Sequence, residues 1–447
     1  MLRSAAFFAV PLVVATAVPS VAEAQQITTE IRGQVTSQAG APLPNAVVVV
    51  TDTRTGETRN LTADQSGLFA ARNLTTGGPY TVSATAEGYQ GQTVQTVNTS
   101  LQGATELTFA LTPVSAEASA GTIVVTAQRA NVQLRAIGPG TGFGTETLEA
   151  FPSISRDVRD IIRIDPRVSL DRANEVDRIS CLGGNDRANT FSVDGIVQAD
   201  VFGLNGTPFA ARNALPLPYD AIRETSVEFA PFDVEYADFT GCAINVVTKS
   251  GENQFHATAF YTYRDENLRG DTIDGEDFIP APFKEKRWGA TLSGPIFQDR
   301  LFFFAGYEET DLGDSNDDGP AGSNFPNEVD FVTQAQFDEF SSILSSVYGQ
   351  ETGGFPRSLP ESSQRYFGRL DWHVTDGHRL EGTYQRLEET NVEADVGTAQ
   401  LAGLNSFEDE GTISDYYSAR LFSEWTENIS TEIRLSRAEV GDVQGPV

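Results

Sequence analysis

Segments in the C-terminal half of the chain alternate apolar and polar residues with a period of two, and this pattern limits the possible folds more than any other feature. In one such segment, Leu370 and Trp372 stand on either side of Asp371. The pattern recurs in the segments 255–263, 366–374 and 417–425. Because successive side chains of a β-strand point to opposite faces, each segment predicts a strand with one apolar and one charged face.

The connections between these predicted strands alternate between long and short. The long ones are 264–283, 308–363 and 388–410, and the short ones are 296–300, 374–379 and 426–430. A soluble β-sandwich also alternates apolar and polar residues, but it does not produce this succession of loop lengths. Long loops on one side of a membrane and tight turns on the other are typical of outer-membrane barrels. We therefore expect an antiparallel transmembrane β-barrel with its apolar face toward lipid.

About seven strands are expected between 254 and 447. This number is too small to close a barrel that is wide enough to hold a domain inside it. An open sheet in lipid would leave backbone groups unpaired, and each such group costs several kcal/mol. We expect the sequence to be the first part of a longer barrel. A short protein that closes its barrel by oligomerisation is the alternative.

The N-terminus has the pattern of an export signal. Arg3 precedes an apolar run at 5–18 that is too short to cross a bilayer, and the run is followed by Ala22-Glu23-Ala24, a small-x-small cleavage pattern. We expect a signal peptide at 1–24, with a membrane anchor or a buried helix as the alternative. No later apolar run has the length of a membrane helix.

Charge and cysteine content narrow the function further. The formal net charge is −31, which argues against nucleic-acid binding and against attachment to an anionic membrane surface. The acidic residues concentrate in the long loops. The two cysteines, Cys181 and Cys242, would enter an oxidising compartment after export, so we expect a disulfide between them. Two buried free thiols are the alternative.

Short strands and tight turns follow one another from Ile27 to Pro113 and predict a small β-sandwich. The segments 33–50, 63–74 and 80–90, with Gly88-Tyr89 at the close, resemble the carboxypeptidase regulatory-like domain. The resemblance implies a transthyretin-like sandwich that serves as an accessory module without catalytic residues. A sugar-binding module is the alternative, although no aromatic platform stands out.

A linker follows, and a short apolar strip interrupts it. The strip consists of Thr122, Ile123, Val124, Val125, Thr126 and Ala127. The glycine-rich run 138–144 lacks the Lys-Ser/Thr of a phosphate-binding loop, so we interpret it as a flexible hinge. The spacing of Leu148, Val158, Ile161 and Ile162 predicts a short helix before Pro166.

The segment from Leu148 to Asp265 resembles the plug domain of TonB-dependent outer-membrane transporters, especially the Oar-like branch with a regulatory-like domain in front. Val193-Asp194-Gly195 and the run Gly241 to Gly251 carry this resemblance. It implies a plug inside a barrel of 22 strands. It also implies that the strip Thr122 to Ala127 is a TonB box, an extended segment that adds a strand to TonB. An ordinary strand of the sandwich or plug is the alternative for the strip.

The expected fold is thus dominated by β-structure. It comprises a signal peptide (1–24), a transthyretin-like sandwich (25–113), a linker with the TonB box (114–135), an α+β plug domain (136–253) and an incomplete transmembrane barrel (254–447).

By resemblance, the expected function is TonB-dependent active transport of an unidentified ligand across the cell outer membrane, with the sandwich and plug on the periplasmic side. The implied partners are TonB with its inner-membrane energising complex, outer-membrane lipid and an extracellular ligand. A non-transporting barrel for adhesion or secretion, or a soluble periplasmic binding protein, is the alternative.

The residues give little support to an enzyme or a metal site. There is no Gly-x-Ser-x-Gly run, and His256, His373 and His378 lack metal-ligand spacing. The loop Asp314 to Gly319 begins like a calcium loop, but Phe325 stands where a bidentate Glu is needed. We interpret it as a solvated acidic loop, and we expect no catalytic residue, metal or cofactor.

Overall fold

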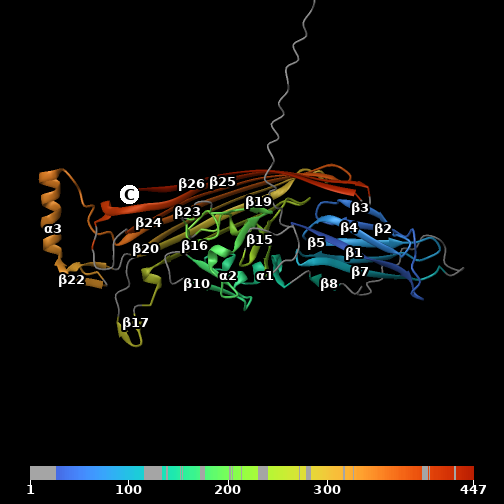
Figure 1. Cartoon of the computed structure of the whole chain (residues 1–447), viewed down its shortest axis with the longest axis horizontal. Coiled ribbons are helices and arrows are strands. Elements are labelled where there is room, and N and C mark those ends of the chain that lie inside the picture. Colours follow the sequence, from blue (N-terminus) through green and yellow to red (C-terminus); the bar gives the residue numbers. More distant parts are fainter. Residues whose placement is uncertain are drawn as a thin grey trace, which may run out of the picture.

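A computed structural model describes residues 27–114, 133–136, 139–151, 153, 155–171, 177–200, 203, 205–212, 214–229, 240–270, 272–277, 283–315, 318–325, 327–394, 401, 403–426 and 429–446. The predicted signal peptide and the proposed TonB box, Thr122 to Ala127, lie outside these residues. A β-sandwich lies beside a second domain, and that domain packs under a long curved sheet (Figure 1).

The first domain is the predicted sandwich. Its strands are β1 (Thr28–Ser37), β2 (Val47–Asp52), β3 (Thr58–Thr62), β4 (Leu68–Thr75), β5 (Gly77–Thr85), β6 (Gln92–Thr99) and β7 (Gly103–Leu111). They form the sheets β4-β1-β7-β8 and β3-β2-β5-β6, and a shared apolar core lies between them. The added edge strand β8 (Gln133–Ala136) comes from the far side of the linker and pairs antiparallel with β7.

The second domain has a five-stranded sheet in the order β13-β12-β15-β14-β9. Its elements are β9 (Gly140–Gly144), α1 (Thr145–Ala150), α2 (Arg159–Ile162), β10 (Val168–Asp171), β11 (Arg178–Cys181), η1 (Asp186–Ala188), β12 (Thr190–Val193), β13 (Ile196–Val197), η2 (Tyr219–Ala221), β14 (Ile222–Glu228) and β15 (Ala243–Thr248). Two short helices, α1 and α2, stand where the sequence predicts one: α1 buries Leu148, α2 buries Ile161 and Ile162, and Val158 is the N-cap of α2. Every residue of β12, β14 and β15 is buried, because both faces of the sheet are covered.

The hinge predicted at 138–144 is wrong over 140–144. These residues form β9, which pairs antiparallel with β14 at the edge of the sheet. The glycines serve close packing there: a side chain at Gly140 would overlap Glu228, and a Cβ at Gly142 would lie 2.8 Å from Cγ of Gln102. A run of glycine therefore marks a strand against which neighbouring side chains pack closely.

The curved sheet contains the seven strands that the sequence predicts, all antiparallel to their neighbours. They are β16 (His256–Asp265), β19 (Lys284–Phe297), β20 (Leu301–Ser315), β23 (Ser358–Thr375), β24 (His378–Ala394), β25 (Phe407–Thr426) and β26 (Ile429–Pro446). Several strands run beyond the alternating segments, so the long connections are shorter than predicted.

The short and long connections lie at opposite ends of this sheet. The tight turns join β19 to β20, β23 to β24 and β25 to β26 at the end that faces the sandwich, and the long connections lie at the other end (Figure 1). Small elements decorate the long connections: η3 (Glu266–Leu268), β17 (Thr272–Ile273), β18 (Glu276–Asp277), β21 (Asp318–Ala321), β22 (Asn327–Thr333), α3 (Gln334–Ile343), η4 (Leu344–Tyr348) and η5 (Leu404–Ser406).

The two faces of the sheet differ as predicted. On the outer face, Tyr261, Leu370 and Trp372 are 63%, 50% and 46% exposed. On the inner face, Arg369 and Asp371 are buried against the second domain. Apolar side chains therefore cover the surface that lipid would contact, and charged side chains face the interior.

Within the described residues, no helix combines the length and the apolar character that crossing a membrane requires.

Candidate functional site

The candidate site is the surface where the second domain meets the inner face of the curved sheet. At its centre lies Arg369 of β23. Its guanidinium donates twice to Asp371, at 2.8 Å each, and once to Glu381 of β24, at 2.7 Å. It also donates to the Thr248 hydroxyl at 3.1 Å and lies 3.8 Å from Asp194, both in the second domain.

The motif Val193-Asp194-Gly195 supplies the other half of this network. Asp194 and Gly195 have φ angles of 47° and 69°, so they form the tight turn between β12 and β13. The Asp194 carboxylate accepts from the backbone N and the hydroxyl of Thr248 at 2.9 and 2.7 Å. Burial raises the pKa of Asp194, and the positive charge of Arg369 opposes this effect. The turn therefore presents a buried carboxyl group to the barrel wall.

Two inward-facing glutamates bind the backbone of the second domain. Glu308 of β20 accepts from the backbone N of Tyr219 at 3.0 Å. Glu389 of β24 accepts from the backbone N of Arg212 and of Ala214, at 2.8 Å each. Hydrogen bonds to a charged acceptor in a water-poor site are among the stronger ones in proteins. The irregular segment between β13 and β14 is thus held to the sheet by its main chain.

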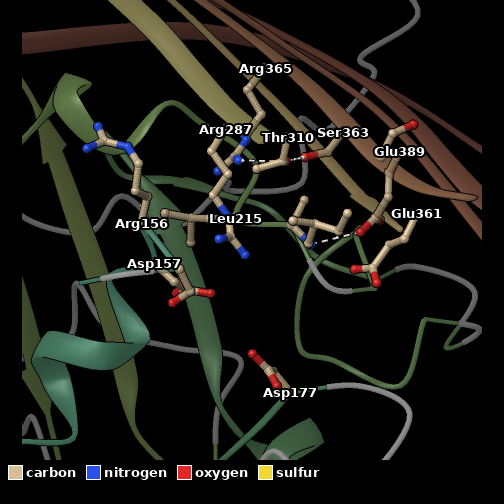
Figure 2. A pocket seen from close by; sticks show the side chains of 14 residues that line it. Arg156, Asp157, Asp177, Leu215, Arg287, Thr310, Glu361, Ser363, Arg365 and Glu389 are labelled. Carbon is tan, nitrogen blue, oxygen red and sulfur yellow. Dashed lines mark hydrogen bonds between the residues drawn. The ribbon is translucent and has the colours of Figure 1, made fainter. Parts of the chain in front are cut away.

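A cavity of about 320 Å³ lies beside these contacts, between the second domain and the sheet. Figure 2 shows its charged lining. Cations and anions both contribute, namely Arg156, Arg287, Arg365, Asp157, Asp177, Glu361 and Glu389, together with Leu215. Such a lining can form hydrogen bonds with a polar solute of either charge.

Cys181 and Cys242 form a disulfide that joins the end of β11 to the start of β15. The cysteines are 3% and 0% exposed. Asn189 supports the bridge from one side, because its side-chain oxygen accepts from the backbone N of Cys242 at 3.0 Å. The bridge encloses the loop that contains β12 and β14, the two strands that flank β15.

The three histidines lie apart. His373 is on the inner face, where its ring lies 3.6 Å from Glu57 of the sandwich. His378 packs its ring against Trp425 at a tight turn, and exposed His256 lies near Glu252. The described residues contain no cluster of three or more potential metal ligands, and the loop Asp314 to Gly319 is only partly described.

Sequence reasoning missed the residues that hold the second domain in place. Arg369 falls on the charged face of a predicted strand, so its inward direction is predictable from the period of two. Its partner Asp194 lies far away in the sequence, and no local pattern joins the two. The same holds for Glu308 and Glu389, whose partners are backbone groups.

Glu228 gives the second domain a pH dependence. Burial raises the pKa of this carboxyl group to about 7, and the charge of Arg167 opposes the effect. Because the folded-state pKa exceeds the unfolded value, the protonated group contributes stability that is fully present below about pH 4.5 and is lost as the pH rises through 7. The full contribution is about 3 kcal/mol.

Glu228→Gln is expected to remove this dependence. At pH 8 the amides of β9 and β14 should exchange hydrogen for deuterium faster in the wild type than in the variant, and at pH 5 the two proteins should exchange alike. If the ratio of the wild-type exchange rate to the Glu228→Gln exchange rate is the same at pH 5 and pH 8, Glu228 is not the source of the pH dependence.

Two protein families match parts of the chain: the carboxypeptidase regulatory-like domain over residues 30–112 and the outer membrane beta barrel domain over residues 247–326. The TonB-dependent transporter Oar of Myxococcus xanthus is 32% identical over 136 residues, which cover 29% of this chain and 12% of Oar. The outer membrane transporter YddB of Escherichia coli has a similar fold, with a TM-score of 0.51 at 13% identity over 69% of this chain and 39% of YddB.

The chain thus spans well under two thirds of the length of either protein. The two domain matches and the similarity to Oar agree with the arrangement in space, in which a sandwich lies beside a domain held inside a curved sheet. The chain thus carries an N-terminal carboxypeptidase regulatory-like domain and part of an outer membrane beta barrel domain, it is similar over 136 residues to a TonB-dependent transporter, and these matches indicate the cell outer membrane as its location.

Proposed function

We propose that the chain belongs to a transporter that takes up a ligand through the outer membrane, with TonB as the source of energy. In this proposal residues 25–113 are the regulatory-like domain, 114–135 the linker, 136–253 a plug and 254–447 part of the barrel. The ligand is unidentified. The proteins to which the chain is similar are transporters, and we propose no enzymatic activity or cofactor for it.

The position of β9 carries this proposal. β9 is an edge strand, bound within the plug sheet only by its ladder to β14 among the described residues. The strip Thr122 to Ala127 precedes it in the chain. A pull on the strip would therefore reach the plug at a strand that can be peeled from its sheet one hydrogen bond at a time, while Arg369 and Glu308 hold the rest.

Binding of TonB to the strip is expected to occur by strand addition, in which backbone groups supply the affinity. Val124→Pro removes an N–H and fixes φ, so it should weaken binding of the purified periplasmic domain of TonB to the full-length protein in nanodiscs at least about tenfold. Ala118→Pro, in the small-residue segment before the strip, is the matched control and should bind like the wild type.

If the wild type and Val124→Pro bind the periplasmic domain of TonB with equal affinity, the strip is not the segment that TonB binds. The absence of TonB binding by the wild type would instead favour the non-transporting barrel for adhesion or secretion.

A further inference from the structure

The regulatory-like domain contacts the plug through a buried carboxylate. Glu224 of β14 is 3% exposed, and its side chain points out of the plug into the sandwich. It accepts hydrogen bonds from the hydroxyl of Thr76, from the hydroxyl of Ser100 at 2.5 Å and from the backbone N of Leu101 at 3.0 Å. All three donors belong to the regulatory-like domain, so one plug side chain connects two of its loops.

The neighbouring Arg223 strengthens this contact. Its guanidinium donates to the carbonyl oxygen of Thr76 at 3.3 Å and to the hydroxyl of Ser250 at 2.6 Å. Thr76 is fully buried. The backbone N of Asn253 also donates to the carbonyl oxygen of Arg54, at 2.9 Å. The plug and the regulatory-like domain thus meet through charged and main-chain groups, of which Glu224, Arg223 and Thr76 are buried.

The same domain binds the barrel at the end that has the tight turns. Arg59 forms an ion pair with Glu424 of β25 at 2.5 Å. Arg379 of β24 donates to the hydroxyl of Thr75, which precedes Thr76 in the chain. The sandwich therefore binds the plug and the barrel wall with adjacent residues.

An apolar cluster lies where the three parts meet. It consists of Ile27 and Leu101 from the regulatory-like domain, Val247 from the plug and Phe422 from the barrel, each at most 8% exposed. A plug that leaves the barrel while the sandwich stays in place must expose this cluster and leave Glu224 without its three donors. Buried charged groups that lose their partners are strongly destabilising.

We propose that the regulatory-like domain is a periplasmic lock that ties the plug to the barrel through Glu224 on one side and Arg59 on the other. The order of segments along the chain means that a force applied to the strip Thr122 to Ala127 acts on this lock first. β8 follows the strip Thr122 to Ala127, precedes β9, and pairs with β7 of the regulatory-like domain. A pull on the strip therefore loads the lock before it reaches the plug, and this part of the inference rests on the proposed function.

A covalent tether tests the lock without TonB. In Arg59→Cys/Glu424→Cys, a bis-maleimide joins the regulatory-like domain to the barrel. The natural cysteines are buried in a disulfide and do not react. The full-length protein is placed in a planar lipid bilayer, and release of the plug is measured as potassium chloride conductance at urea concentrations that leave the sandwich folded.

Glu224→Ala alone should raise the conductance about tenfold at a fixed urea concentration, because three donors of the regulatory-like domain lose their shared acceptor in the plug. The tether alone should lower it about tenfold relative to the uncoupled double-cysteine protein. In the tethered protein, Glu224→Ala should restore the conductance that the tether lowered. The regulatory-like domain then stays bound to the barrel but no longer holds the plug. This result would exclude the alternative that the tethered sandwich lowers the conductance only by blocking the pore.

Glu228→Ala is the matched control, because Glu228 is a buried acid on the same strand that lies against Gly140 of the plug. It should not raise the conductance. Conductance that is insensitive to the tether, or a tether whose protection survives Glu224→Ala, overturns the lock. Because TonB is absent from the measurement, neither result bears on the proposed function, and failure of TonB binding leaves this experiment intact.

Discussion

Arg369→Leu is expected to weaken the hold of the barrel on the plug by roughly 3 to 5 kcal/mol. Arg369 is the cation that Asp194, Asp371 and Glu381 share, and all four side chains are buried. Without it, the buried carboxyl groups of Asp194 and Asp371 lose the cation that they share, whereas Glu381 keeps an ion pair with Arg420 at 3.5 Å. Removal of one member of a buried network leaves charged partners without compensation, which accounts for the size of the effect.

The urea concentration at which trypsin cleaves the plug of the full-length protein measures this loss, and it should fall by about 1 M or more. Asp194→Asn in the same chain removes one of the stranded charges and should restore part of the resistance. Arg264→Leu is the control, because Arg264 pairs with Glu285 in an exposed position, where such pairs contribute less than about 1 kcal/mol. Equal effects of the two leucine variants would show that burial of the network contributes nothing.

Loss of the disulfide is the second large effect that we expect. The cysteines are separated by 61 residues, and closing a loop of that length stabilises a folded domain by about 4 kcal/mol in the chain-entropy model. The enclosed segment holds β12 and β14, so its release should loosen the plug sheet on both sides of β15.

The double variant Cys181→Ser/Cys242→Ser should show faster amide exchange in β12, β14 and β15, with the barrel strands unchanged. Reduction of the wild type should reproduce this pattern, and the reductant should have no effect on the double variant. Faster exchange in the barrel strands as well would mean that the bridge acts on the whole assembly and not on the plug.

The period of two was sufficient to predict the curved sheet, its seven strands and the direction of side chains such as Leu370 and Asp371. It failed to find the strand ends. β20 continues to Ser315 and β23 begins at Ser358. These ends lack alternation, but each is paired in the ladder between the two strands. Cross-strand pairing is a long-range interaction that local periodicity does not contain.

The candidate site was less predictable than the fold. A resemblance drew attention to Asp194, but the cation beside it, Arg369, comes from a strand that the sequence does not associate with it. The glycines of β9 were misinterpreted because glycine is common both in hinges and in strands where another chain segment approaches closely. Only the packing of Glu228 and Gln102 against them distinguishes the two.

The separation of tight turns and long connections imposes different limits on sequence change at the two ends of the barrel. Doubling the length of a flexible connection costs only about 0.6 kcal/mol of closure free energy, so the segment with β22 and α3 can be rebuilt freely by insertion. The turn end has no such freedom, because Glu424 and Arg379 there bind the regulatory-like domain. New recognition surfaces can therefore evolve at one end while the mechanical coupling at the other end is preserved.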